Sequence, residues 1–274
     1  MIPAAFDYKR AGSAAEAISL LVEYGDEAKL LAGGHSLIPL MKFRLASPAV
    51  LVDIAKVTDL SYVNDAGDHL AIGALTRHRD IEISDLVASQ AGLLVAATRN
   101  VGDPQVRHRG TIGGAIAHGD PASDIPAAML AMRADFVLQG PDGERTVSAD
   151  DFFTGFLETA LAEDEMLTEI RLAKTPDAKF SFQKFNRRAQ DWAIVGAAIQ
   201  VNNGSSGVAL VNMDNRPIRA AGVEAALASG ASAADAAAAA AEGAEPPADL
   251  NASVEYRQHL ARVLTRRGLE EAGV

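Results

Sequence analysis

The sequence contains no cysteine among its 274 residues. Disulfide bonds, thiolate catalysis, iron–sulfur ligation and cysteine-based zinc sites are therefore excluded within this polypeptide, because each of them needs a cysteine sulfur. No other metal site is predicted. A redox centre of these kinds, if the chain works with one, must lie on a partner.

A long apolar run and an excess of positive charge are also missing. No segment approaches the ~20 apolar residues that span a bilayer, and the first ten residues lack the basic-then-apolar order of a secretory signal. We therefore expect a cytoplasmic protein without a transmembrane segment; export as cargo of a folded, signal-bearing complex stays open. The net charge of -11, from 36 acidic and 25 basic residues, argues against binding to nucleic acid or to an anionic membrane surface.

The common nucleotide-binding motifs do not occur. Neither the Rossmann pattern G-x-G-x-x-G nor the P-loop pattern G-x-x-x-x-G-K-[ST] is found, so a nicotinamide-type fold and a nucleoside triphosphatase lose their usual sequence support. A nucleotide would have to be held in another way.

Two glycine-rich segments suggest that other way. They are Ala32-Gly33-Gly34-His35-Ser36 and Thr111-Ile112-Gly113-Gly114-Ala115. Glycine lets consecutive backbone N–H groups turn toward one point, and such a nest of amides binds anions, more so where a helix begins. A tight strand-to-helix turn also needs glycine, so a purely structural role is the alternative. Two nests in one chain predict one large anionic ligand, a dinucleotide diphosphate.

Apolar periodicity, capping residues and turn residues predict alternating helices and strands. The predicted helices cover 14–24 (with Ile18, Leu21 and Val22 buried), 37–43, 81–88, 93–100, 123–132, 231–241 and 253–272. The predicted strands cover 29–31, 50–54, 166–172, 180–185, 194–201 and 208–211, with hairpins within 62–75 and 135–147. An α+β protein follows, with 174–178 as the expected linker.

The second glycine segment lies within a longer motif, Arg107 to Asp124, which begins with a basic triplet and ends with an aspartate at a helix start. With 32–42, 103–114 and 117–121, it resembles the FAD-binding medium subunits of molybdenum hydroxylases, the xanthine dehydrogenase and aerobic carbon monoxide dehydrogenase family. The likeness extends over nearly the whole chain and is greatest to the carbon monoxide dehydrogenase branch. These motifs are specific for the flavin subunit and less specific for carbon monoxide.

The resemblance implies the fold and the domains. They are a two-subdomain FAD-binding fold of the p-cresol methylhydroxylase (vanillyl-alcohol oxidase) type and a smaller C-terminal α+β domain of the carbon monoxide dehydrogenase flavoprotein type. The expected boundaries are 1–55, 56–175 and 176–274.

The same resemblance implies the residues that bind FAD, non-covalently. The two glycine segments are expected at the diphosphate and ribityl chain, Asp124 at the sugar-alcohol region, the 101–105 segment and Trp192 against the flavin ring, and Leu167 and Lys184 near the ring and the adenine side. The full set is Ala32, Gly33, Gly34, His35, Ser36, Leu37, Val101, Asp103, Thr111, Ile112, Gly113, Gly114, Ala115, Ala117, Asp124, Leu167, Lys184 and Trp192.

Several of these residues have a plainer interpretation. Asp124 is also an acid favoured at a helix N-terminus, Lys184 could belong to a solvated basic strand end with Arg187 and Arg188, and a lone tryptophan such as Trp192 is more often core. His35 and His118 invite a covalent flavin link, for which loop hydrogen bonding is the alternative.

The family implies an oxidoreductase subunit without catalytic residues of its own. A flavin couples single-electron and two-electron steps, so electrons would pass from two [2Fe-2S] clusters on a small partner subunit, through FAD, to a quinone or another acceptor. Substrate would be oxidised on a large molybdenum-cofactor subunit, in a dimer of heterotrimers that could lie peripherally at the inner face of the membrane. Alternatives are a medium subunit for a purine, N-heteroaromatic or aldehyde hydroxylase, a non-catalytic FAD-binding assembly protein, and a free-standing flavin oxidase.

Overall fold

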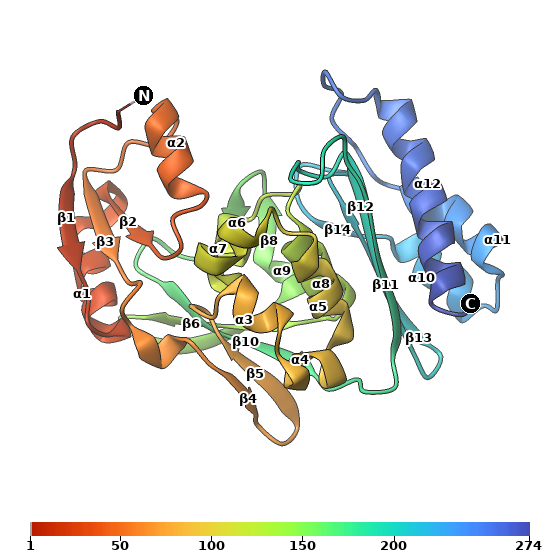
Figure 1. Ribbon diagram of the computed structural model, residues 1–274, viewed down its shortest axis with the longest axis horizontal. Coiled ribbons are helices and arrows are strands. Elements are labelled where there is room, and N and C mark those ends of the chain that lie inside the picture. Colours follow the sequence, from red (N-terminus) through yellow and green to blue (C-terminus); the bar gives the residue numbers. More distant parts are fainter. Residues whose placement is uncertain (1) are drawn as a thin grey trace.

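The computed structural model describes residues 2–274, in which three mixed parts follow one another along the chain. Each part has its own main sheet and its own cluster of buried apolar side chains. In Figure 1 the parts lie in a row, from the N-terminal part on the left to the C-terminal part on the right. The predicted α+β class is confirmed.

The N-terminal part is a parallel sheet in the order β1-β3-β2 with two helices. Its elements are β1 (Asp7–Arg10), α1 (Ala14–Tyr24), β2 (Ala28–Leu31), α2 (Leu37–Phe43) and β3 (Val50–Asp53). The Ser13 hydroxyl accepts the N–H of Glu16, so α1 begins where the capping pattern predicts. Val22, predicted to be buried, is 56% exposed, because the buried face is centred on Leu21 and Val22 lies about 100° further round the helix. Strand β1 was not predicted.

The middle part is a five-stranded antiparallel sheet in the order β4-β5-β10-β6-β7, covered by short helices. Its strands are β4 (Val63–Asp65), β5 (His69–Gly73), β6 (Asp135–Gly140), β7 (Gly143–Ser148) and β10 (Met166–Ala173), and a small hairpin joins β8 (Phe153–Gly155) to β9 (Glu158–Thr159). Its helices are α3 (His78–Glu82), α4 (Asp85–Gln90), α5 (Gly92–Arg99), α6 (Pro104–Arg109), α7 (Ile112–His118), α8 (Asp124–Ala131) and α9 (Ala149–Phe152). Both predicted hairpins are confirmed.

One helix prediction in this part is wrong, and α6 is among the helices that were missed. The single helix predicted over 81–88 is divided between α3 and α4, because the Ser84 hydroxyl accepts the N–H of Val87 and starts a new helix. Helix α6 was not predicted; Asp103 caps it through the N–H of Val106, and Pro104 occupies its first turn.

The C-terminal part is a four-stranded antiparallel sheet in the order β11-β12-β13-β14. Its strands are β11 (Lys179–Phe185), β12 (Val195–Asn202), β13 (Ser205–Val211) and β14 (Ile218–Arg219), followed by α10 (Ala221–Ala228), α11 (Ala233–Ala238) and α12 (Val254–Glu271). Two helices were predicted here. Helix α10, which begins 12 residues before α11, was not predicted, and the predicted 231–241 helix is α11 followed by a turn of 3₁₀ helix at Ala239–Ala241.

Both faces of the C-terminal sheet are buried, and this docks it on the middle part. Along β12, Ala197 and Ile199 join the C-terminal apolar cluster, whereas Ala198 between them joins the cluster of the middle part. Neighbouring strand residues point to opposite faces, so one strand serves both cores. Helix α12 covers one face (Figure 1), and α8 contacts β12 and β13 from the other.

Candidate functional site

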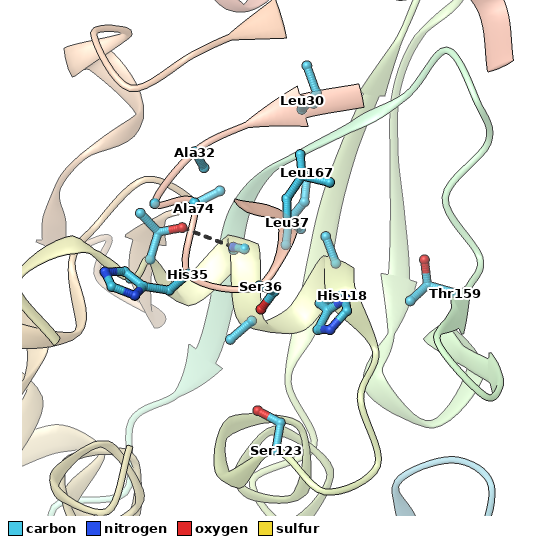
Figure 2. A pocket seen from close by; sticks show the side chains of 18 of the residues that line it. Leu30, Ala32, His35, Ser36, Leu37, Ala74, His118, Ser123, Thr159 and Leu167 are labelled. Atoms are coloured by element: carbon cyan, nitrogen blue, oxygen red, sulfur yellow. Dashed lines mark hydrogen bonds between the residues drawn. The ribbon is translucent and has the colours of Figure 1, made fainter. Parts of the chain in front are cut away.

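A cavity of about 780 Å³ lies where the three parts meet. Its lining comes from the loop after β2, from the middle part and from the segment that joins β11 to β12. Figure 2 shows Leu30, Ser36, His118, Ser123 and Thr159 around it. The volume is in the upper part of the ~300–1,000 Å³ range typical of ligand pockets, and apolar and polar groups share the walls.

The first glycine segment packs against the two residues directly before the second one, and both segments line the same cavity. A Cβ added to Gly33 would lie 2.4 Å from the carbonyl oxygen of Arg109 and 2.9 Å from Cα of Gly110. No side chain fits there, so glycine is required for the approach. Gly34 has φ 77°, the left-handed region that favours glycine. The convergence predicted for these two segments is therefore present.

The first segment carries the free amides. The backbone N–H groups of 33–37 have no acceptor among the groups of residues 2–274, and all five residues line the cavity. Successive amides of this kind can bind the oxygens of an anion. This loop is the part of the chain that fits a diphosphate.

The second segment differs from the prediction. It is the first turn of α7 with Thr111 as its cap, and its amides are already used. The N–H of Ile112 donates to Thr76 O at 3.0 Å, that of Gly113 to Ala74 O at 2.9 Å, and that of Gly114 to Thr111 Oγ1 at 3.1 Å. The prediction of a second nest of free amides is therefore wrong. Because a Cβ on Gly113 would lie 2.5 Å from Cβ of Ala74, its glycine allows α7 to pack closely on the strand end and form a floor of small residues.

A buried ion pair closes the cavity on the C-terminal side. Lys184 Nζ lies 2.8 Å from Asp124 Oδ2 and donates to Asn100 O at 2.9 Å, and the two side chains are only 5% and 6% exposed. Lys184 is therefore not part of a solvated strand end, whereas Asp124 is indeed the first residue of α8. Burial raises the pKa of the Asp124 carboxyl to about 6, against the opposing effect of Lys184. Its Oδ1 has no hydrogen-bond partner within 2–274, so a ligand hydroxyl could satisfy it.

All but two of the predicted site residues line this cavity. The lining residues are Ala32, Gly33, Gly34, His35, Ser36, Leu37, Val101, Thr111, Gly113, Gly114, Ala115, Ala117, Asp124, Leu167, Lys184 and Trp192. Ile112 is instead fully buried in the core of the middle part. Asp103 caps α6 and accepts a hydrogen bond from Gln190 Nε2 at 3.0 Å, so it acts on the segment next to the cavity.

Other lining residues were not predicted. They include Leu30 and Leu31 on the free edge of β2, Ala74, His78, four residues of the β8–β9 hairpin (Thr154, Leu157, Glu158 and Thr159), and Leu161, Ala162, Glu163, Glu165 and Met166. Burial lowers the pKa of His78 to about 4, with Arg107 adding to the effect, so its imidazole is neutral at neutral pH. The small and apolar residues among them carry no sequence signal beyond their type, and His78 and the glutamates Glu158, Glu163 and Glu165 belong to no recognised motif.

The histidines and the tryptophan can now be placed. His35 is exposed, and His118 ends α7 at the cavity wall, where burial lowers its pKa. Neither side chain forms a hydrogen bond within 2–274, so loop hydrogen bonding is not their role there. Trp192 is 57% exposed and lines the cavity, so the interpretation of it as core is wrong.

The described residues contain no group of three or more His, Asp or Glu side chains placed to hold a metal ion. No helix within 2–274 is long and apolar enough to cross a membrane.

Comparisons with known proteins agree with this geometry. The family model "FAD binding domain in molybdopterin dehydrogenase" matches residues 4–175, and "CO dehydrogenase flavoprotein C-terminal domain" matches 180–272. The chain belongs to the FAD-binding medium subunits of the molybdenum hydroxylases, and it is an oxidoreductase subunit whose cofactor is FAD.

Individual relatives are similar over the full length. The chain is 40% identical to the carbon monoxide dehydrogenase medium chain of Hydrogenophaga pseudoflava, over 99% of this chain and 98% of the other. It is 37% identical to the glyceraldehyde dehydrogenase medium chain of Sulfolobus acidocaldarius, over 99% of both. A solved structure of carbon monoxide dehydrogenase from Hydrogenophaga pseudoflava matches with a TM-score of 0.96 and 41% identity, over 99% of this chain and 98% of that one. The predicted family and FAD-binding fold are confirmed.

Proposed function

We propose that this chain is the electron-transfer subunit of a carbon monoxide dehydrogenase-type molybdenum hydroxylase. In this role, electrons from [2Fe-2S] clusters on a partner subunit reach an external acceptor, such as a quinone, by way of FAD. The observation that carries the proposal is the loop 33–37, whose free amides face a cavity large enough for a dinucleotide. The full-length similarity to medium chains of such enzymes supports it.

Each wall of the cavity then has a role. The amides of 33–37 bind the diphosphate, and the small residues of 111–117 form the floor that lets it approach. Asp124, fixed by Lys184, accepts hydrogen bonds from the sugar-alcohol chain. Val101, Leu167 and Trp192 supply apolar contacts to the rings. FAD is held non-covalently, and His35 and His118 are polar wall residues.

The division of labour among subunits follows from chemistry. Bound FAD exchanges electrons singly with iron–sulfur clusters and in pairs with other acceptors. Since this chain has no cysteine, the clusters belong to a small subunit, and the molybdenum cofactor to a large one, in a dimer of heterotrimers. This chain contributes binding, orientation and exclusion of water, in the domains 1–55, 56–175 and 176–274. The complex is cytoplasmic and associates with the inner face of the membrane.

The substrate of the complex is the open alternative. The 37% identity to a glyceraldehyde dehydrogenase medium chain favours an aldehyde hydroxylase as second candidate, ahead of purine and N-heteroaromatic hydroxylases. The substrate pocket belongs to the large subunit, so this chain does not discriminate among them.

The test is to purify the chain with its associated subunits and add substrates without oxygen, carbon monoxide first. We expect one FAD per chain and rapid bleaching of the flavin absorption by carbon monoxide. Bleaching by an aldehyde alone would favour the second candidate. A colourless complex, or a mature complex that lacks this chain, would overturn the proposal; the latter result would indicate an assembly protein. Substrate turnover by the lone chain would indicate a free-standing flavin oxidase.

A further inference from the structure

The segment 186–194, which joins β11 to β12, is anchored at three points. Its two ends are joined by the N–H of Ile194, which donates to Phe185 O at 2.8 Å. Before it, Lys184 is fixed by Asp124, and within it Gln190 donates to Asp103. Trp192 therefore reaches the cavity from a segment that is held on both sides.

Two consecutive carbonyls directly after Trp192 are bound by distant side chains. Asn212 Nδ2 donates to Ala193 O at 2.8 Å, and Arg257 Nη1 on α12 donates to Ile194 O. Both carbonyls precede β12, which begins at Val195, so the sheet ladder does not use them. The side chains replace the missing strand partner and fix the direction in which the chain leaves Trp192.

Burial of the Arg257 guanidinium costs desolvation free energy, and helix packing alone does not require a charged residue at this position. It is 1% exposed, its Nη2 lies 2.8 Å from Asp249 Oδ2, and its Nε has no partner within 2–274. A buried guanidinium is expensive, and an apolar residue would dock a helix on a sheet as well. The neighbouring positions Leu260, Ala261 and Leu264 of α12 do this.

A second cavity of about 680 Å³ lies against the same residues. It is lined by Asn212, Arg257 and Ile194, and shares only Asp191 and Trp192 with the first cavity. The Trp192 segment thus separates two open spaces, and Trp192 itself is 57% exposed. The side chains of Ala193 and Ile194 after it pack into the two apolar clusters, and the hydrogen bonds to their carbonyls fix the direction in which Trp192 leaves this anchor.

We propose that Arg257 and Asn212 are positioning residues that hold Trp192 as a wall of the flavin site. The inference rests on the proposed function for the identity of the ligand, whereas the placement of Trp192 is independent of it. Neither residue lines the first cavity, so both act through the backbone at 193–194.

The single tryptophan makes a direct test available, because all indole fluorescence of the full chain comes from Trp192. In flavin-free full-length chain, Arg257→Gln and Asn212→Gly should each shift the emission and increase quenching by acrylamide. Asn212 has φ 59°, so glycine keeps the backbone conformation and removes only the amide donor. Arg262→Gln on the same helix, whose Nε donates to Ala238 O at 3.2 Å, is the matched control and should change nothing.

FAD titration of the same variants provides the second readout. If Trp192 is in place in only ~10% of molecules, the apparent Kd for FAD rises about tenfold. Arg257→Lys keeps the charge and hydrogen-bond donors but has one nitrogen where Arg257 uses two, so it should restore part of both effects. Millimolar methylguanidinium should restore Arg257→Ala through the second cavity.

The outcomes separate the inference from the proposed function. Changed quenching of Trp192 together with weakened FAD binding supports the inference about Arg257 and Asn212. Unchanged Trp192 quenching in folded Asn212→Gly overturns it, even if Arg257→Gln fails to fold. A freed Trp192 with an unchanged Kd for FAD also overturns it while leaving the proposed function intact, and wild-type chain that never binds FAD, alone or with its partners, contradicts the proposed function instead.

Discussion

Lys184 and Asp124 form an ion pair of 2.8 Å between two parts of the chain that are 60 residues apart. Lys184 is on β11 of the C-terminal sheet, and Asp124 begins α8 of the middle part. The pair lies in the cavity wall and is almost fully buried. The pair therefore has two roles: it holds the C-terminal sheet against the middle part, and it places charged groups in the wall of the flavin site.

Breaking this pair from one side should be costly. We expect Lys184→Met to lower the free energy of unfolding by about 3–5 kcal/mol, because it leaves a buried carboxylate without its cation. Lys184→Met with Asp124→Asn should cost less than the sum of the single changes, and denaturant unfolding of the four proteins measures the coupling. The exposed pair of Arg188 with Asp191 is the control: Arg188→Gln should leave the free energy of unfolding close to that of wild type, because water and salt screen the pair. Additive effects at 184 and 124 would contradict the coupling.

The titration of Asp124 should contribute to the pH dependence of the free energy of unfolding. Burial raises its pKa from 3.8 to about 6, so the folded chain holds a proton that the unfolded chain has lost in this window. Its contribution is fully present below about pH 3.8 and is lost as the pH rises through 6, on the order of 3 kcal/mol for roughly two pKa units. Between pH 4.5 and 7.5, wild type should therefore lose stability relative to Asp124→Asn. Parallel pH profiles for the two proteins would show that the pKa of Asp124 is not raised.

Replacement of Gly33 should remove the flavin. An alanine Cβ at this position would lie 2.4 Å from Arg109 O, which is backbone and cannot move aside cheaply, so the loop 33–37 must move away from residues 109 and 110. We expect Gly33→Ala to lose bound FAD during purification, as measured by the ratio of visible to ultraviolet absorption. Gly12→Ala is the control, because its Cβ would meet only the flexible Glu16 carboxylate at 3.4 Å. Full flavin content in Gly33→Ala would contradict the proposed site.

The contact of β13 with α8 gives a prediction far from the cavity mouth. A Cβ on Gly207 would lie 1.9 Å from the carbonyl oxygen of Ala131, the last residue of α8. We expect Gly207→Ala to cost at least 1–3 kcal/mol of stability, as overpacking usually does. Helix α8 begins with Asp124, so its displacement should also weaken FAD binding. Ser206→Ala on the same strand should leave both quantities near wild type; equal behaviour of the two variants would contradict this.

The sequence predicts most of the site because its residue types are unusual. Glycine pairs and the Arg107 to Asp124 motif identify the cavity walls before any coordinates, and both hairpins follow from their turn residues. What it does not predict depends on distant neighbours. The amides at 112 and 113 are occupied by carbonyls of Ala74 and Thr76, which lie over 35 residues upstream and carry no motif. The burial of Lys184 likewise needs the docked C-terminal sheet, and short elements such as β1 and α6 are too brief for apolar periodicity.

The cavity between the three parts has a consequence for assembly. Each part has its own apolar cluster, yet the lining includes residues from all of them, so tight binding requires that they have come together. By mass action, a ligand at 100 times its Kd would stabilise that union by about 2.7 kcal/mol. The yellow colour of a preparation would then measure the fraction of molecules in which folding is complete, and flavin supply during synthesis would set the yield of intact protein.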